Sequence, residues 1–107
     1  MKPAPFKYHD PQSLPELVEL TATLEDAKIL AGGQSLMPMM NMRFVTPDDV
    51  VDINNISELD FIESKKGKLQ IGALTRQRDI INSKEVSLVA PIIREALLNV
   101  GHLQTRN

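Results

Sequence analysis

The sequence predicts an α+β fold built from two small subdomains. The first, residues 1–54, contains two strand-like segments joined through a helix-like segment, which favours a parallel βαβ crossover. The second, residues 55–107, starts with two strand-like segments around a glycine turn, which is typical of an antiparallel hairpin, and continues with helical patterns. With 107 residues, the chain is long enough for one modest hydrophobic core.

The first subdomain is expected to open with an amphipathic helix. Ser13 and Glu16 have the spacing of a capping box, in which the serine caps the helix and the glutamate reaches back. The residues that follow at helical spacing are Leu14, Leu17, Val18, Thr21 and Leu24. We further predict a short buried strand over residues 28–30, a helix over residues 36–43 and another strand over residues 50–53.

Four methionines fall within the predicted helix over residues 36–43, namely Met37, Met39, Met40 and Met42. Thioether side chains fill irregular gaps in hydrophobic cores, so we expect these residues to pack under the preceding loop. The two histidines, His9 and His102, are separated by most of the chain, and the sequence contains no cysteine. This pattern does not build a metal site, and we predict none.

The second subdomain is predicted to hold a hairpin and two helices. Its strands are expected over residues 59–64 and 68–72, with Gly67 available for a positive φ in the turn. The helices are expected over residues 75–82 and 91–100. The apolar face of the second helix comprises Val89, Ile92, Ile93, Ala96, Leu97 and Val100.

Composition argues against several classes of function. The net charge is -2 and the largest basic cluster is Lys65-Lys66 with Lys68, so we expect no nucleic-acid partner. No stretch approaches the ~20 apolar residues of a membrane span, and we expect a cytoplasmic protein. Because the chain lacks cysteine, it cannot itself hold a cysteine-ligated iron–sulfur cluster or a disulfide.

The sequence offers no clear acid, base or nucleophile. The paired acids Glu25-Asp26 and Asp48-Asp49 lie at element boundaries, where solvent usually covers carboxylates. Ser35 lacks the surroundings of a nucleophile pattern such as Gly-x-Ser-x-Gly, and a hydrogen bond to a phosphate or a helix N-cap suits it better. We therefore predict no catalytic residue in this chain.

One segment has the character of a ligand loop. Residues 31–35, Ala-Gly-Gly-Gln-Ser, lie where a predicted strand gives way to a predicted helix. Two residues without side chains let a phosphate approach backbone N–H groups and the positive end of the helix dipole. Gly-Gly pairs also occur in ordinary turns, so the two glycines alone favour a plain structural turn.

The longer string around this loop is more specific. Residues 30–43, Leu-Ala-Gly-Gly-Gln-Ser-Leu-Met-Pro-Met-Met-Asn-Met-Arg, closely resemble the first flavin-phosphate motif in the FAD-binding subunits of molybdenum hydroxylases. That family includes the medium subunit of carbon monoxide dehydrogenase and the FAD domain of xanthine dehydrogenase. Residues 6–11, 71–75 and 100–107 are similar to the family in the same order, so the resemblance spans the whole chain.

The resemblance implies a set of FAD-binding residues. They are Leu30, Ala31, Gly32, Gly33, Gln34, Ser35, Leu36 and Thr75. Backbone N–H groups of residues 31–35 and the Ser35 hydroxyl would hold the FAD pyrophosphate, while Gln34 shapes the loop and Leu36 packs it. Leu30 and the loop over residues 72–75, which includes Thr75, are expected to make further contacts with FAD. A Cβ at either glycine would obstruct the close approach of backbone and phosphate.

The resemblance also implies partners. A large subunit would carry the molybdenum cofactor and a small subunit the [2Fe-2S] clusters, while FAD passes electrons to an acceptor. Family members continue beyond the last matching segment with a second glycine motif, so we expect this chain to represent the N-terminal portion of a flavin subunit and to be inactive alone. Two alternatives remain open: a non-catalytic remnant that serves as a folded or subunit-interaction module, and an unrelated small anion-binding module.

Overall fold

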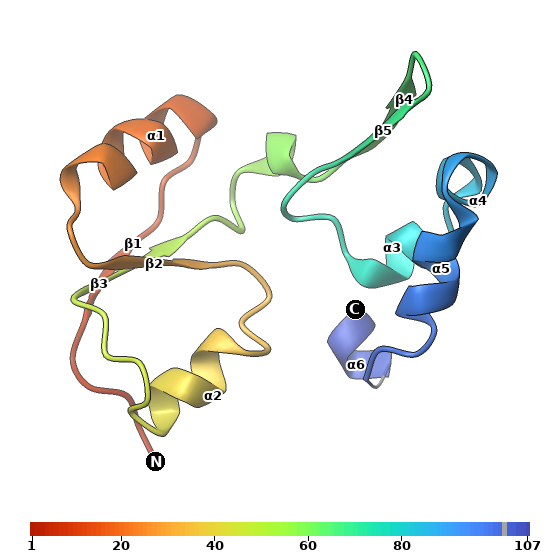
Figure 1. Ribbon diagram of the computed structural model, residues 1–107. Coiled ribbons are helices and arrows are strands. Elements are labelled where there is room, and N and C mark those ends of the chain that lie inside the picture. The colour runs from red at the N-terminus through yellow and green to blue at the C-terminus, as the bar shows by residue number, and fades with distance from the viewer. Residues whose placement is uncertain (102) are drawn as a thin grey trace. The chain divides into compact units, whose positions relative to one another are not determined.

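The computed structural model describes residues 1–101 and 103–107. The chain divides into two compact units, Met1–Ser57 and Glu58–Asn107. Helices and strands occur in both, which confirms the predicted α+β class (Figure 1). Within the described residues, no helix is long and apolar enough to cross a membrane. No group of three or more described His, Cys, Asp or Glu residues could hold a metal ion, and His102 lies outside the described residues.

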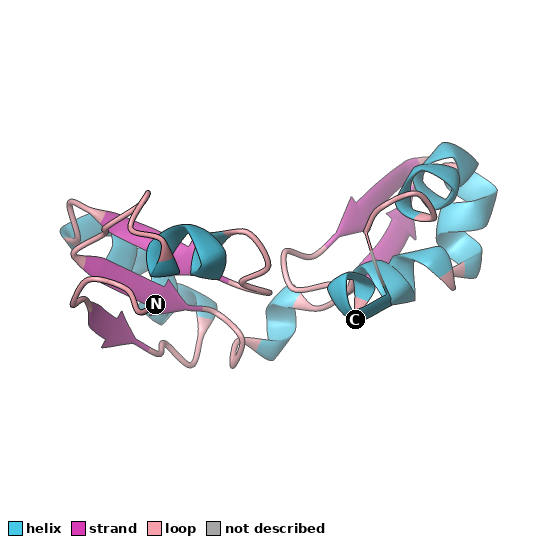
Figure 2. Cartoon of the chain, turned by 90° about the horizontal axis from the view of Figure 1, so that it is seen from below, coloured by secondary structure: helices cyan, strands magenta, loops and turns pink. Residues whose placement is uncertain are grey.

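The first unit is a three-stranded parallel sheet with a helix on each side (Figures 1 and 2). Its elements are β1 (Lys7–His9), α1 (Leu14–Thr23), β2 (Ala27–Leu30), α2 (Leu36–Asn41) and β3 (Asp49–Asp52). The strand order is β1-β3-β2, and β3 pairs in parallel with both neighbours. The predicted parallel βαβ crossover, from β2 through α2 to β3, is therefore confirmed.

The core of the first unit is centred on β3. Val50 and Val51 are at most 1% exposed because the central strand is covered on both faces, and Ile53, Ile56 and Met40 complete the buried set. The expected strand at residues 28–30 is present, but the prediction that it is buried was wrong. It lies at the sheet edge with β3 on one side only, and Ile29 is 47% exposed.

Helix α1 begins as its capping residues predict. The Oγ atom of Ser13 accepts a hydrogen bond from the N–H of Glu16 at 3.3 Å. The Glu16 carboxylate accepts one from the N–H of Gln12 at 2.9 Å, one residue before the cap. The expected apolar face is only partly correct, since Leu17 is half-buried while Val18 is 60% exposed.

Helix α2 is shorter than predicted. It ends at Asn41 because Arg43 adopts a left-handed backbone conformation, with φ 58°, and donates its N–H to the Met40 carbonyl. Met40 is buried, which confirms its predicted role in the core. For Met39 and Met42 that prediction was wrong, because Met39 is 38% exposed and the early end of the helix leaves Met42 51% exposed.

The second unit places helices beside an antiparallel hairpin (Figure 2). Its elements are β4 (Ile62–Lys65), β5 (Lys68–Ile71), α3 (Gln77–Ile81), α4 (Lys84–Val89), α5 (Pro91–Leu97) and α6 (Leu103–Arg106), and a 3-10 turn at Ser57–Leu59 precedes them. The predicted hairpin is confirmed. Lys66 and Gly67 both have positive φ in the turn, which suits the twist of a tight hairpin. Helix α4 contacts both strands.

The helices of the second unit differ from the prediction at their ends. The helix expected at residues 75–82 begins at Gln77, and the one expected at 91–100 ends at Leu97. Helix α4 was not predicted, and it begins where Ser83 Oγ accepts the N–H of Val86 at 3.3 Å. The apolar face predicted for residues 89–100 is not buried, since Ile92, one of its members, is 67% exposed.

Candidate functional site

The glycine loop lies at the carboxyl end of β2, between Leu30 and the first residue of α2. Leu30 is in register with Asp52, the last residue of β3, so the loop shares one edge of the sheet with the end of the central strand. In open α/β sheets this edge is where ligands bind. The fold therefore places six of the predicted residues, 31–36, together at a suitable position.

The loop presents unpaired backbone donors. No described residue accepts a hydrogen bond from the backbone N–H groups of residues 31–36. The chain turns sharply here, and the first backbone bond after the loop runs from the N–H of Met37 to the Gly33 carbonyl at 3.1 Å. Free N–H groups at consecutive positions can converge on an anion, as they do in phosphate-binding loops.

The two glycines serve different purposes. Gly33 has φ 73°, and a Cβ built there would lie 3.0 Å from Met37 Cγ and 3.2 Å from Leu30 Cδ1. The fold itself therefore favours glycine at this position. At Gly32 the φ is not positive, and a Cβ added there would have no atom within 4 Å. Nothing within the described protein explains glycine at position 32, whereas close approach by a ligand would require it.

The other side chains in and beside the glycine loop are either exposed to solvent or half-buried against the protein. Gln34 and Ser35 are exposed, whereas Leu30 and Leu36 are half-buried. Ser35 occupies the N-cap of α2, yet its hydroxyl accepts no capping hydrogen bond from the described backbone, because the residue has helical φ and ψ. Since α2 has only six residues, the loop N–H groups rather than a long helix dipole supply the positive potential.

Thr75 and its loop lie in the second unit. The Thr75 hydroxyl donates to the Phe61 carbonyl at 2.9 Å and accepts the Phe61 N–H at 3.3 Å, so its one donor hydrogen is used inside that unit. A Cβ at Gly72 would lie 2.0 Å from the Leu59 carbonyl oxygen, so glycine is required there for packing. These contacts give both residues a structural role that the sequence did not reveal.

Sequence reasoning missed a hydrogen-bonded chain behind the glycine loop. Asn54 Nδ2 donates to the Ala31 carbonyl at 2.8 Å and to Asp52 Oδ1 at 2.7 Å. Oδ1 of Asp52 also accepts the Asn54 N–H at 2.9 Å, while its Oδ2 accepts the Tyr8 hydroxyl. The available signal was the polar pattern at the end of the strand over residues 50–53, where Asp52 and Asn54 alternate with buried Ile53.

These hydrogen bonds affect both ionisable groups. Partial burial raises the pKa of Asp52, but hydrogen bonds from Tyr8 and Asn54 outweigh it, and the pKa is lowered overall. The hydrogen bond to Asp52 is the largest of the causes that raise the pKa of Tyr8 to about 12. Asp52 is therefore a carboxylate, and Tyr8 a neutral phenol, throughout the physiological pH range.

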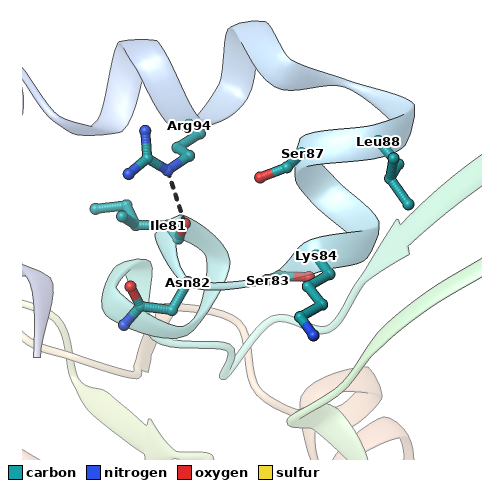
Figure 3. A pocket seen from close by; sticks show the side chains of 7 residues that line it. All are labelled: Ile81, Asn82, Ser83, Lys84, Ser87, Leu88 and Arg94. Carbon is teal, nitrogen blue, oxygen red and sulfur yellow. Dashed lines mark hydrogen bonds between the residues drawn. The ribbon is translucent and has the colours of Figure 1, made fainter.

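A cavity of about 460 Å³ lies in the second unit, where α3, α4 and α5 meet (Figure 3). Its lining includes two cations, Lys84 and Arg94. Arg94 Nε donates to the Ile81 carbonyl at 3.1 Å and so joins α5 to α3, while Ser83 caps the start of α4. This cavity was not anticipated from the sequence, and its contacts indicate a structural role.

Comparison with known proteins identifies the class. The family model described as the FAD binding domain in molybdopterin dehydrogenase matches residues 4–107. The carbon monoxide dehydrogenase medium chain of Hydrogenophaga pseudoflava is 44% identical over the whole chain, and the glyceraldehyde dehydrogenase medium chain of Sulfolobus acidocaldarius is 36% identical. The chain belongs to the family of FAD-binding domains found in molybdopterin dehydrogenases.

Solved structures agree with this assignment. The carbon monoxide dehydrogenase of Hydrogenophaga pseudoflava that lacks the Mo-pyranopterin moiety matches all of the chain with a TM-score of 0.92 at 44% identity. Quinoline 2-oxidoreductase from Pseudomonas putida 86 matches it with a TM-score of 0.93 at 38% identity. The chain covers 38% of each of these structures and 38% of each of the two medium chains.

The glycine loop fits the cofactor of this family. FAD carries a pyrophosphate whose oxygens accept hydrogen bonds, and residues 31–36 offer backbone donors that no described residue uses. The open space beside Gly32 leaves room for a phosphate to reach them. The donor set and the space are therefore compatible with FAD.

Proposed function

We propose that residues 31–35 bind the pyrophosphate of FAD in a subunit that carries electrons from iron–sulfur clusters to an acceptor. The observation that carries the proposal is the run of N–H groups at residues 31–36 that no described residue uses, beside a glycine that the fold does not need at position 32. A plain turn of the chain would not require glycine at position 32, because a Cβ there would meet no described atom. Unpaired N–H groups are tolerated on an exposed loop, because water or a ligand can accept hydrogen bonds from them.

The chain's own residues would act by binding and positioning. The N–H groups of the loop would donate to phosphate oxygens, the Ser35 hydroxyl would add a further donor, and Leu30 and Leu36 would support the loop from below. FAD, when bound, supplies the redox chemistry. We further propose that the two units, Met1–Ser57 and Glu58–Asn107, serve as two subdomains of one FAD-binding domain, with Thr75 as a contact from the second.

We propose two partner subunits, a large one with a molybdenum cofactor and a small one with [2Fe-2S] clusters. Two facts support this. The similar proteins are medium chains of dehydrogenases, a description that belongs to multi-chain enzymes. The chain has no cysteine, so iron–sulfur clusters held by thiolates must come from another polypeptide or domain.

A titration of the full-length protein tests the proposal. Apo-protein is titrated with FAD and, separately, with riboflavin, which has the same ring system but no phosphate, and quenching of flavin fluorescence is followed. We expect FAD to bind at least about a hundredfold more tightly, equivalent to about 2.7 kcal/mol. Equal affinities would contradict a pyrophosphate site. Binding of neither flavin would favour the alternative of a folded or subunit-interaction module without cofactor.

One observation favours that alternative. The second unit exposes large apolar side chains, including Leu88 at 84%, Leu103 at 70% and Ile92 at 67%. Exposed apolar side chains are typical of protein contacts where they gather into one patch. The flavin absorbance of the purified protein separates the two functions, because an interaction module would be colourless.

A further inference from the structure

We propose that Asn54 is a positioning residue for the glycine loop, held in place by Asp52. This inference rests on the proposed function, because the loop is taken to bind FAD. Asn54 follows β3, whereas the loop follows β2, so the contact between them joins the ends of two neighbouring strands. Asn54 itself need not touch the cofactor, since it acts through the backbone of Ala31.

The amide group of Asn54 matches its two partners. Nδ2 carries two hydrogens, and it lies 2.8 Å from the Ala31 carbonyl oxygen and 2.7 Å from Asp52 Oδ1. The amide nitrogen must face this pair, because the amide oxygen would meet two further oxygens. The Asn54 N–H also donates to Oδ1 of Asp52, so backbone and side chain of Asn54 are fixed by the same carboxylate.

The hydrogen bond to the Ala31 carbonyl orients the next peptide N–H. The carbonyl of Ala31 and the N–H of Gly32 belong to one planar peptide group, so fixing the oxygen also fixes the direction of that N–H. This N–H is one of the donors that no described residue uses. Preorganised donors bind an anion more tightly, because they need not be ordered when the ligand arrives.

Because Asp52 lies near the loop, the direction in which its substitution changes the FAD affinity tests the inference. A carboxylate near an anion site repels the anion, so removal of its charge should tighten binding if charge is its only effect. If Asp52 instead acts by holding Asn54, the isosteric change Asp52→Asn should weaken binding, because a neutral amide oxygen accepts the two hydrogen bonds from Asn54 less strongly than a carboxylate does. Charge repulsion therefore predicts tighter FAD binding by Asp52→Asn, whereas the holding of Asn54 predicts weaker binding.

Asn55 provides a matched control. It is the same residue type at the next position and is also exposed, but its Nδ2 donates to Asp10 Oδ1 at 2.8 Å. That hydrogen bond leads to the segment after β1 and away from the glycine loop. Truncating Asn55 to alanine therefore removes a comparable hydrogen bond near the end of β3 without releasing the Ala31 carbonyl.

The experiment measures the FAD dissociation constant of the full-length apo-protein and four variants: Asn54→Ala, Asp52→Asn, the double variant, and Asn55→Ala. We expect Asn54→Ala to raise the constant about tenfold, or about 1.4 kcal/mol, the net worth of one hydrogen bond. Asp52→Asn should also raise it. The double variant should be little worse than Asn54→Ala, because both residues act through one chain of hydrogen bonds. Asn55→Ala should match the wild type.

A second readout separates positioning from general stability. The melting temperatures of the apo-proteins Asn54→Ala and Asn55→Ala should agree, because the change at Asn54 lowers the affinity for FAD rather than the stability of the fold. Equal FAD affinity for Asn54→Ala and Asn55→Ala, or tighter binding by Asp52→Asn, would overturn the inference while leaving FAD binding intact. A wild-type protein that fails to bind FAD would instead overturn the proposed function, and this inference with it.

Discussion

The hydroxyl of Tyr8 donates a hydrogen bond of 2.5 Å to Oδ2 of Asp52, although the two residues are 44 positions apart in the sequence. Tyr8 is paired with Val50 in the parallel ladder of β1 and β3, so Asp52 lies two residues further along the neighbouring strand. The bond ties the outer strand β1 to the carboxyl end of the central strand. It also stabilises the neutral form of Tyr8 against ionisation.

The first prediction uses Tyr8 as a spectroscopic probe. It is the single tyrosine among the 107 residues, so ultraviolet absorbance of tyrosinate reports its ionisation alone. We expect a midpoint near pH 12 in the folded chain, since the Asp52 carboxylate raises the pKa of Tyr8 to about 12. Asp52→Asn should move the midpoint toward the ordinary value near 10, whereas Asp48→Asn should not.

The same shift affects stability at high pH. Because the pKa of Tyr8 is higher in the folded than in the unfolded chain, its contribution to stability is complete below about pH 10 and is lost as the pH rises toward 12. Tyr8→Phe should remove this part of the alkaline loss of stability, measured by urea unfolding followed by circular dichroism. A folded wild-type chain that titrates near pH 10 would contradict the hydrogen bond.

A second prediction concerns the methionines of α2. Met40 is 1% exposed, so Met40→Ala should lower the free energy of unfolding by about 2–5 kcal/mol through lost burial and the cavity left behind. Met39 on the same helix is 38% exposed, and Met39→Ala should cost markedly less. Chemical denaturation of both variants gives the comparison. Equal losses would mean that α2 packs on a different face.

The two glycines of the loop supply a third prediction. Gly33→Ala should destabilise the protein by about 1–3 kcal/mol, because alanine is strained at φ 73° and its Cβ would crowd Met37 and Leu30. Gly32→Ala should change the free energy of unfolding by no more than about 0.5 kcal/mol, since its Cβ meets open space. Thermal unfolding of the two variants, without flavin, is the measurement. Similar losses would show that both glycines are required by the fold.

Local signals in the sequence predicted local structure well. The capping box at Ser13 and Glu16 marks the start of α1, and Gly67 marks the turn of the hairpin, because each depends only on neighbouring residues. Strand β1 could not be found in this way. Its three residues, Lys7–His9, have no distinctive pattern, and they form a strand because they pair with β3, about 40 residues later. Helix α4 does carry a local signal, the N-capping residue Ser83.

The candidate site was predicted only in part, because some of its features are local in the sequence and others depend on contacts between distant residues. The loop at residues 31–35 is one continuous segment, so its glycines and the strand before it reveal it in the sequence. Asn54 could not be recognised, because its importance depends on reaching the Ala31 carbonyl from another strand. The distinction between Gly32 and Gly33 likewise needs the surroundings of each Cβ position, which sequence alone does not give.

A fourth prediction concerns residues 1–107 as an isolated polypeptide. They span 38% of the similar medium chains, and they leave large apolar side chains such as Leu88 exposed. We expect FAD to bind this polypeptide with a dissociation constant in the micromolar range or weaker. One loop supplies few donors, while immobilising the ligand still costs about 4–15 kcal/mol. Calorimetric titration with FAD checks this, and nanomolar binding would show that the loop needs no further cradle.

The most direct test of the central claim is the FAD affinity of the full-length protein carrying Gly32→Val. The fold leaves space around a Cβ at this position, but a phosphate close to the loop backbone would meet the added side chain. We expect the melting temperature of the apo-protein to stay close to that of the wild type and the FAD dissociation constant to rise at least about tenfold, or about 1.4 kcal/mol. Unchanged flavin content and affinity in this variant would contradict binding of the pyrophosphate at residues 31–35.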